Sequence, residues 1–158
     1  MTGITLLIVS QSAKYTTQIL QGISLTKNKE DFFVIIRPHQ AEESFNYKEL
    51  LKKLGLNGKM DIKTVLYEQF KEANIILGVD STGLFEAVLA KRPVIFCDGK
   101  GFLRHLESQI INIYANEKSL VHAESPKQLG EILDNPFPYF AKALNYKTKR
   151  IGDIIVYA

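Results

Sequence analysis

Residues 74–98 place the tightest limits on what this chain can fold into. They read NIILGVDSTGLFEAVLAKRPVIFCD, with a short apolar run, a polar turn, an amphipathic segment and a second apolar run. Short apolar runs predict strands that are buried on both faces. The segment between them predicts a helix that ends at Lys91 and Arg92, where cations suit the negative end of the helix dipole. Its expected core face consists of Leu84, Phe85, Val88 and Leu89.

The same alternation of apolar runs and amphipathic segments continues along the chain. It predicts strands at residues 4–9, 32–36, 75–79 and 94–97, with weaker patterns at 56–62, 110–114 and 119–122. Helices are expected at 13–27, 42–54, from 61 or 63 to 73, to about 108 after 98–101, from 126 and at 139–149. The helix before the strand at 75–79 is expected to bury Ile62, Val65, Leu66, Phe70 and Ala73. This order predicts one Rossmann-like, three-layer α/β/α domain with a mainly parallel sheet.

The composition is that of an ordinary globular domain of 158 residues, with 46% hydrophobic and 23% charged residues. The net charge of +3 is too small to argue for a nucleic-acid partner. Basic residues look scattered, except for a C-terminal set that fits a solvated helix face, a membrane-surface patch or a patch for an acidic partner: Lys142, Lys147, Lys149 and Arg150. No apolar run reaches 18 residues, which favours a cytoplasmic protein. Cys97 is expected in the core, and the three histidines match no metal-ligand spacing.

Polar residues follow each of the strongest predicted strands. In a parallel α/β sheet, ligands bind beyond the carboxyl ends of the strands, so these residues are expected to share one cleft. The residues expected to line that cleft are Ser10, Gln11, Ser12 and Asp98.

The turn after residues 75–79 is the best candidate for a phosphate site. Ser81, Thr82 and the backbone N–H groups near Gly83 would stand at a helix N-terminus, which attracts anions. Ser81 and Thr82 also suit plain helix capping, and both interpretations stay open. Glu86, one turn into the helix, would accept hydrogen bonds from a ribose diol or complement the helix dipole.

The second predicted strand ends in Arg37-Pro38-His39. As an imidazolium, His39 would donate to a phosphate and stabilise a leaving group; otherwise it is a capped turn residue. Arg37 would bind phosphate or pair with a surface acid.

Several common sites are excluded by their motifs. Gly99-Lys100-Gly101 lacks the glycine and the Ser/Thr of a P-loop, and neither GxGxxG nor GxSxG is present. A receiver domain would need acidic residues after the first strand, where Ser10 and Gln11 stand. A flavodoxin-like FMN-binding module survives, because the residues after that strand are rich in hydroxyl groups.

The combination of a strand ending in RPH with a later D-S-T-x-x-x-E-A and K-R-P-V-I resembles the C-terminal half of GT-B glycosyltransferases. The likeness covers about residues 4–144. It is nearest to bacterial capsular and surface polysaccharide enzymes of the CDP-glycerol glycerophosphotransferase, Kdo-transferase and sialyltransferase types. The resemblance implies that Ser81 and Thr82 contact donor phosphates, that Glu86 binds the ribose and that His39 assists departure of the nucleotide.

The resemblance also implies an organisation and a chemistry. Residues 1–158 would be one donor-binding domain, the C-terminal half of a two-domain transferase, with a tail at 150–158 that crosses to the other domain. The partners would be a nucleotide-activated sugar or alditol and an acceptor glycan held by that other domain. The enzyme would need no metal or cofactor, would work in the cytoplasm or at the inner membrane face, and would be inactive as this half alone. A UDP-GlcNAc 2-epimerase-like enzyme is the alternative, although Thr82 and Ala87 stand where such enzymes carry a glycine and a second glutamate.

Overall fold

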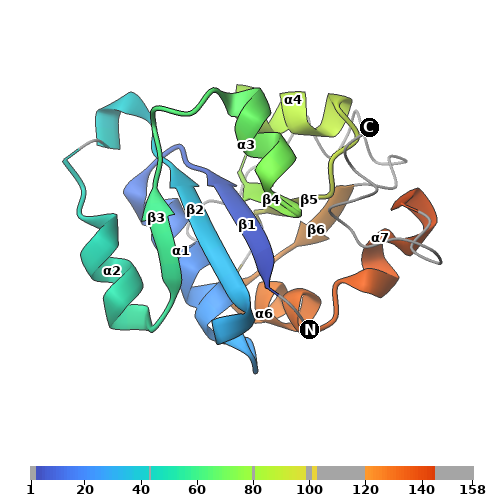
Figure 1. Cartoon of the computed structure of the whole chain (residues 1–158). Coiled ribbons are helices and arrows are strands. Elements are labelled where there is room, and N and C mark those ends of the chain that lie inside the picture. Colours follow the sequence, from blue (N-terminus) through green and yellow to red (C-terminus); the bar gives the residue numbers. More distant parts are fainter. Residues whose placement is uncertain (1–2, 43, 80, 99–100, 103–119, 145–158) are drawn as a thin grey trace.

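The computed structural model describes residues 3–42, 44–79, 81–98, 101–102 and 120–144. Its centre is a six-stranded sheet in which every pairing is parallel, in the order β3-β2-β1-β4-β5-β6 (Figure 1). The strands are β1 (Ile4–Val9), β2 (Phe32–Arg37), β3 (Asn57–Met60), β4 (Ile75–Gly78), β5 (Val94–Cys97) and β6 (Leu120–Ala123). The predicted parallel α/β sheet is confirmed.

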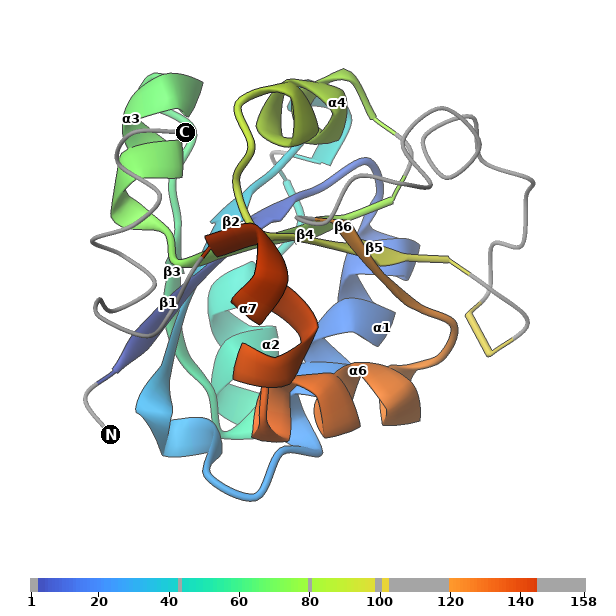
Figure 2. The same cartoon turned by 90° about the vertical axis from the view of Figure 1, so that its right-hand side faces the viewer.

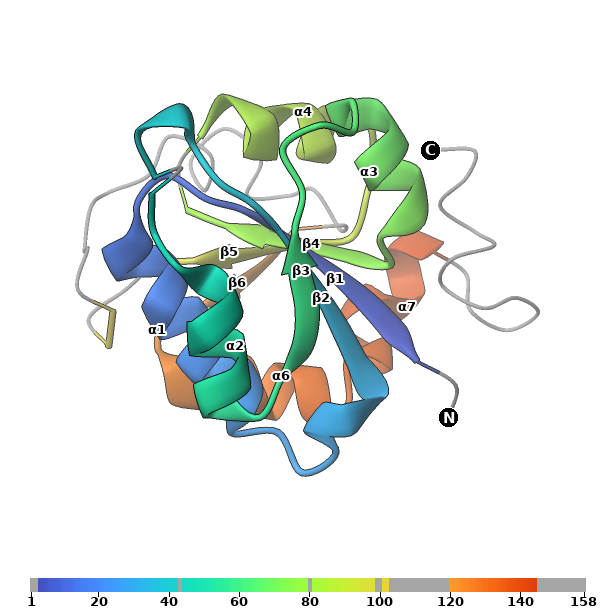
Figure 3. The same cartoon turned by 60° about the vertical axis from the view of Figure 1, so that its left-hand side comes forward.

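Helices cover both faces of the sheet, which gives three layers (Figures 2 and 3). One face carries α1 (Ala13–Ser24), α2 (Tyr47–Leu54), α6 (Pro126–Asp134) and α7 (Phe137–Leu144). The other face carries α3 (Leu66–Glu72) and α4 (Thr82–Leu89). Two short 3-10 turns, η1 (Lys29–Asp31) and η2 (Gln40–Glu42), flank β2. Among the described residues, no helix is long and apolar enough to cross a membrane.

The core follows the two-residue period of the strands. In β1, Leu6 and Ile8 pack in the cluster that holds α1, α2 and α6, whereas Leu7 and Val9 pack in the cluster that holds α3 and α4. Strands with both faces covered in this way need nearly continuous apolar sequence, which is why they were visible in the residue string.

Two predicted helices begin later in the structure than in the sequence analysis. The helix expected within 42–54, most clearly at 47–54, begins at Tyr47, because Glu42 belongs to η2 and Asn46 accepts the N–H of Glu49 as the N-cap. It ends as predicted at Gly55, which adopts the left-handed conformation.

The helix expected from residue 61 or 63 begins only at Leu66. The Asp61 carboxylate accepts the N–H groups of Lys63 and Thr64, both at 3.0 Å, and so holds a turn instead of a helix. The same hydrogen bonds, with the Thr64 hydroxyl as the largest cause, lower the pKa of Asp61 to about 2. Ile62 and Val65, predicted to be buried, are exposed as a result.

Helix α4 also departs from its predicted face and end. Leu89 is 64% exposed, and Ala87 is buried in its place. Arg92 is not a solvated cation at the helix end: it is buried, it donates to the carbonyl of Ala73 at 3.4 Å, and burial lowers its pKa to about 10. The helix expected to about 108, the strand at 110–114 and the tail at 150–158 lie outside the described residues.

The end of α4 generates a test of backbone strain. The N–H of Lys91 bonds to Val88 O at 2.9 Å and that of Arg92 to Ala87 O at 3.0 Å, the two bonds of a Schellman motif. Lys91 therefore takes a φ of 56°, the positive value that glycine adopts without strain. We expect Lys91→Gly to raise the free energy of unfolding by about 1 kcal/mol in urea titrations, because the strain relieved exceeds the entropy lost.

Lys91→Ala is the matched control, since it removes the same charge but keeps a side chain at positive φ. Equal stability of the two variants would contradict the strain explanation.

Candidate functional site

The carboxyl edge of the sheet contains a point at which the strand order reverses. Strand β1 lies between β2 and β4, and Val9 at its end pairs with Arg37 on one side and Gly78 on the other. The chain leaves β1 and β4 toward helices on opposite faces of the sheet. Such a reversal is where ligands bind in open parallel sheets. The loops after β2, β1 and β4 therefore lie next to one another along this edge.

The N-terminus of α4 stands at this reversal. Ser81 is the N-cap, and its hydroxyl oxygen accepts the N–H of Leu84 at 3.1 Å. The N–H of Phe85 makes the first main-chain helical bond, to Ser81 O, so the N–H groups of Thr82 and Gly83 precede the helical ladder. Because Thr82 is exposed and Gly83 half-buried, these N–H groups can serve an anion.

A close contact fixes this helix end against β1. A Cβ built on Gly83 would lie 2.9 Å from Val9 Cγ1, which only a glycine avoids. The structure thus brings the predicted Ser81–Gly83 turn directly to the end of β1. Glu86 lies one turn further along α4 and is half-buried.

His39 lies beside this point, in the turn that leaves β2. Its N–H donates to Glu42 Oε1 at 3.1 Å, and its carbonyl accepts the N–H of Glu42 at 2.8 Å. Its ring is exposed, and the ring Nδ1 accepts the N–H of Ala41 at 3.2 Å. This contact engages Nδ1 and leaves Nε2 as the ring nitrogen for a ligand.

A buried carboxylate that the sequence analysis did not single out holds this turn in place. Glu42 is 6% exposed, and its two carboxylate oxygens lie 2.8 and 2.7 Å from Ser10 Oγ. The Tyr47 hydroxyl donates to Glu42 Oε2, and the Thr16 hydroxyl bonds to Ser10 Oγ. Three segments of the chain thereby meet at the Glu42 carboxylate, and Ser10 links them to α1 through Thr16. The weak signal in the sequence was an acid three residues after His39.

Arg37 is anchored away from the position expected for a phosphate ligand. Its Nη1 donates to Thr64 O at 2.6 Å and to Gln69 Oε1 at 2.9 Å. Gln69 is fully buried and donates in turn to Asp61 O at 3.0 Å. Among the described residues no carboxylate pairs with Arg37, so the expected surface ion pair is absent there.

The four residues expected to line the cleft divide into two groups. Gln11 and Ser12 are half-buried at the start of α1, on the edge itself. Ser10 and Asp98 are buried, so they support the edge from beneath and do not form its surface. Beside Asp98, the ring Nε2 of His122 bonds to the Asp98 backbone carbonyl.

Solved structures share this fold. The chain superposes on the C-terminal CMP-Kdo binding domain of WaaA from Acinetobacter baumannii with a TM-score of 0.65 and 14% identity, covering 93% of this chain and 90% of that one. It superposes on the catalytic domain of cholesterol-α-glucosyltransferase from Helicobacter pylori with a TM-score of 0.60 and 19% identity, covering 91% and 99%. The expected Rossmann-like half of a GT-B fold is confirmed.

A nucleotide-sugar isomerising enzyme shares the fold as well. The chain superposes on UDP-GlcNAc 2-epimerase from Neisseria meningitidis, bound to UDP-GlcNAc, with a TM-score of 0.61 and 17% identity. It covers 98% of this chain and 42% of the epimerase, so the chain spans less than half of that enzyme. No protein-family model matches the chain, and no curated protein matches it in sequence. At these identities, the likenesses establish the fold alone.

The hydroxyl network around Glu42 generates a pH-dependent prediction. Burial, followed by the hydrogen bond to Glu42, raises the pKa of Tyr47 well above its ordinary value. The neutral phenol therefore stabilises the fold fully below about pH 10, and this contribution is lost as the pH rises above 10 toward the folded-state pKa. We expect Tyr47→Phe to cost about 1.5–3 kcal/mol in urea unfolding at pH 7 and less at each higher pH above 10.

Tyr67→Phe is the control, because the Tyr67 side chain is 60% exposed. It should leave the stability at pH 7 unchanged. If the loss of unfolding free energy in Tyr47→Phe stayed constant from pH 7 to 11, the raised pKa of Tyr47 would be contradicted.

Proposed function

We propose that the chain is the donor-binding domain of a bacterial glycosyltransferase that acts on a nucleotide-activated sugar or alditol in surface polysaccharide synthesis. The observation that carries the proposal is the N-terminus of α4, held against β1 at the strand-order reversal with two N–H groups ahead of the helical ladder. The structures that share the fold support it, since one binds CMP-Kdo and another was solved with UDP-GlcNAc.

The proposed phosphate site consists of main-chain N–H groups and one hydroxyl. The N–H groups of Thr82 and Gly83 would bind phosphate oxygens, and the helix dipole would favour their charge. Ser81 caps the helix with its oxygen and retains its hydroxyl hydrogen for a ligand, so the two roles expected from the sequence are compatible. We propose that the helix end replaces a metal ion here, so EDTA should not affect binding.

Two side chains would complete the donor site. Glu86, one turn into α4, would accept the ribose hydroxyls. His39 would donate from Nε2 to the phosphate that leaves, a role for which its Glu42-anchored turn keeps it in position. Arg37 would add positive charge to the edge from its anchored position without contacting the phosphate through Nη1.

A UDP-GlcNAc 2-epimerase-like function is the second candidate, favoured by the epimerase that shares the fold. Ala87 argues against it, because it stands where the resemblance places a second glutamate and is fully buried. In either case the acceptor site and the full activity belong to a larger protein, and we expect this chain alone to bind nucleotide without turnover.

The proposal is tested by titrating the chain with CMP, CDP, UDP, ADP and FMN and following the backbone amide signals by NMR. We expect one nucleotide diphosphate or monophosphate to shift the amide signals of residues 81–86 and of His39. Ser81→Ala should weaken binding of that nucleotide about 10- to 100-fold, because one hydrogen bond to a charged group is lost.

Ser125→Ala is the matched control. Ser125 caps α6 as Ser81 caps α4, accepting the N–H of Gln128 at 3.0 Å, so both variants lose a comparable cap of about 1 kcal/mol. Equal affinity of the two variants would show that Ser81 only caps its helix. A response to FMN alone would favour a flavodoxin-like module, and no shift at residues 81–86 with any nucleotide would refute the site.

A further inference from the structure

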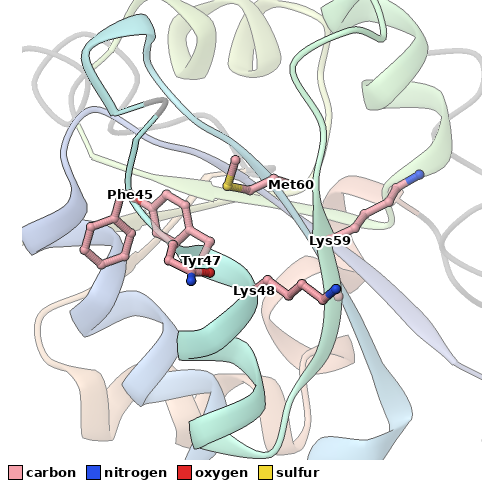
Figure 4. Close-up of a pocket in the computed structure, with 7 residues that line it drawn as sticks. Phe45, Tyr47, Lys48, Lys59 and Met60 are labelled. Carbon is pink, nitrogen blue, oxygen red and sulfur yellow. The ribbon is translucent and has the colours of Figure 1, made fainter.

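One basic stretch of the chain follows α2 and β3. Residues 45–65 hold five lysines and two acidic residues, a net charge of +3. The C-terminal set at 142–150, with four basic residues and no acidic one, is a second basic stretch. We call the surface formed by α2, β3 and the turn after β3 the lysine face. Its five lysines are all exposed: Lys48, Lys52 and Lys53 lie on α2, Lys63 lies in the turn, and Lys59 extends from β3 away from Met60 (Figure 4).

The charge on the lysine face is uncompensated in the described part of the chain. None of its five lysines lies within 4.0 Å of a carboxylate there, where Lys71 and Glu68 form the one ion pair. The two acids are occupied locally: Glu49 accepts from Asn46 at 3.3 Å, and Asp61 accepts from its own turn. The face therefore presents its positive charges to whatever approaches it.

An apolar hollow opens within this face. A cavity of about 350 Å³ lies between the start of α2 and β3, and Figure 4 shows Met60 extending from β3 toward the rings of Phe45 and Tyr47. Phe45 and Met60 are each 37% exposed, although both are large and apolar. Lys48 lines this cavity and also the open depression beside it, which Lys52 and Lys53 line. Apolar and cationic side chains thus share one surface.

We propose that the lysine face docks onto an anionic lipid bilayer. The ammonium groups of the lysine face would contact the lipid phosphates. The aliphatic stems of these lysines and the Phe45 and Met60 side chains would enter the interfacial region of the bilayer. The lysines alone would not indicate a bilayer, because a few lysines attract a soluble anion equally well. A lipid surface would also cover the adjacent exposed apolar groups, whereas a soluble anion would leave them in water.

The test is co-sedimentation of the chain with vesicles of equimolar phosphatidylglycerol and phosphatidylcholine, compared with vesicles of phosphatidylcholine alone. We expect binding to the anionic vesicles only, weakening with added salt. The triple variant Lys48→Gln, Lys52→Gln and Lys53→Gln should bind roughly 100-fold more weakly, at about 1 kcal/mol for each lysine near the surface.

A second triple variant separates this face from net charge. Lys14→Gln, Lys27→Gln and Lys127→Gln remove three exposed lysines from the α1 and α6 side, so both triple variants have the same net charge. This variant should bind nearly as the parent does. Equal losses in both triple variants would overturn the proposal in favour of unspecific attraction.

The apolar part is tested with Met60→Gln, against Leu89→Gln on α4 as an exposed apolar control. Met60→Gln alone should weaken vesicle binding. Retention on heparin without vesicle binding would overturn the proposal in favour of a soluble polyanion. Because no step uses the nucleotide site, vesicle binding and nucleotide binding can fail independently, and amide spectra of each variant confirm that it is folded.

Discussion

The hydrogen bonds of the buried Glu42 carboxylate hold together the part of the carboxyl edge that follows β1 and β2. This carboxylate contacts Ser10 after β1, the main chain of His39 after β2 and the Tyr47 hydroxyl at the start of α2. A buried carboxylate is costly unless hydrogen bonds replace its water, and here three donors do so. If one of these loops moved, Glu42 would lose a hydrogen bond and its buried carboxylate would be destabilised. The loops after β1 and β2 therefore form one connected surface and not two independent turns.

How much the sequence revealed depended on the range of the interactions. Strands with two buried faces and the turn at Ser81 are encoded by neighbouring residues, so the sheet and the α4 N-terminus could be predicted. The late start of α3 was missed although its cause is local, because the apolar pattern at 62–73 concealed the turn that Asp61 holds with Lys63 and Thr64. Glu42 was missed because its partner is distant: beside exposed residues it looks like a solvated acid, and Ser10 is 32 residues away.

The two candidate surfaces are close to one another in the fold. Met60, on the lysine face, pairs with Ile36, and β2 ends one residue later at Arg37. A bilayer against the lysine face would therefore lie beside the loop that carries His39. Such an orientation suits a transferase whose acceptor is anchored in lipid. The donor would be bound close to the bilayer, and the acceptor would not have to leave the membrane.

Gly83 and Val9 are distant in sequence but lie in contact, so side chains at these two positions would compete for the same space. Any side chain at 83 would occupy the space that the valine methyl group fills at the end of β1. A larger residue at position 83 therefore requires the residue 9 side chain to shift or to become smaller. Among homologous sequences, the two positions should covary in size although 74 residues separate them. The geometry of the helix end would then depend on the core residues of the sheet as much as on the polar turn itself.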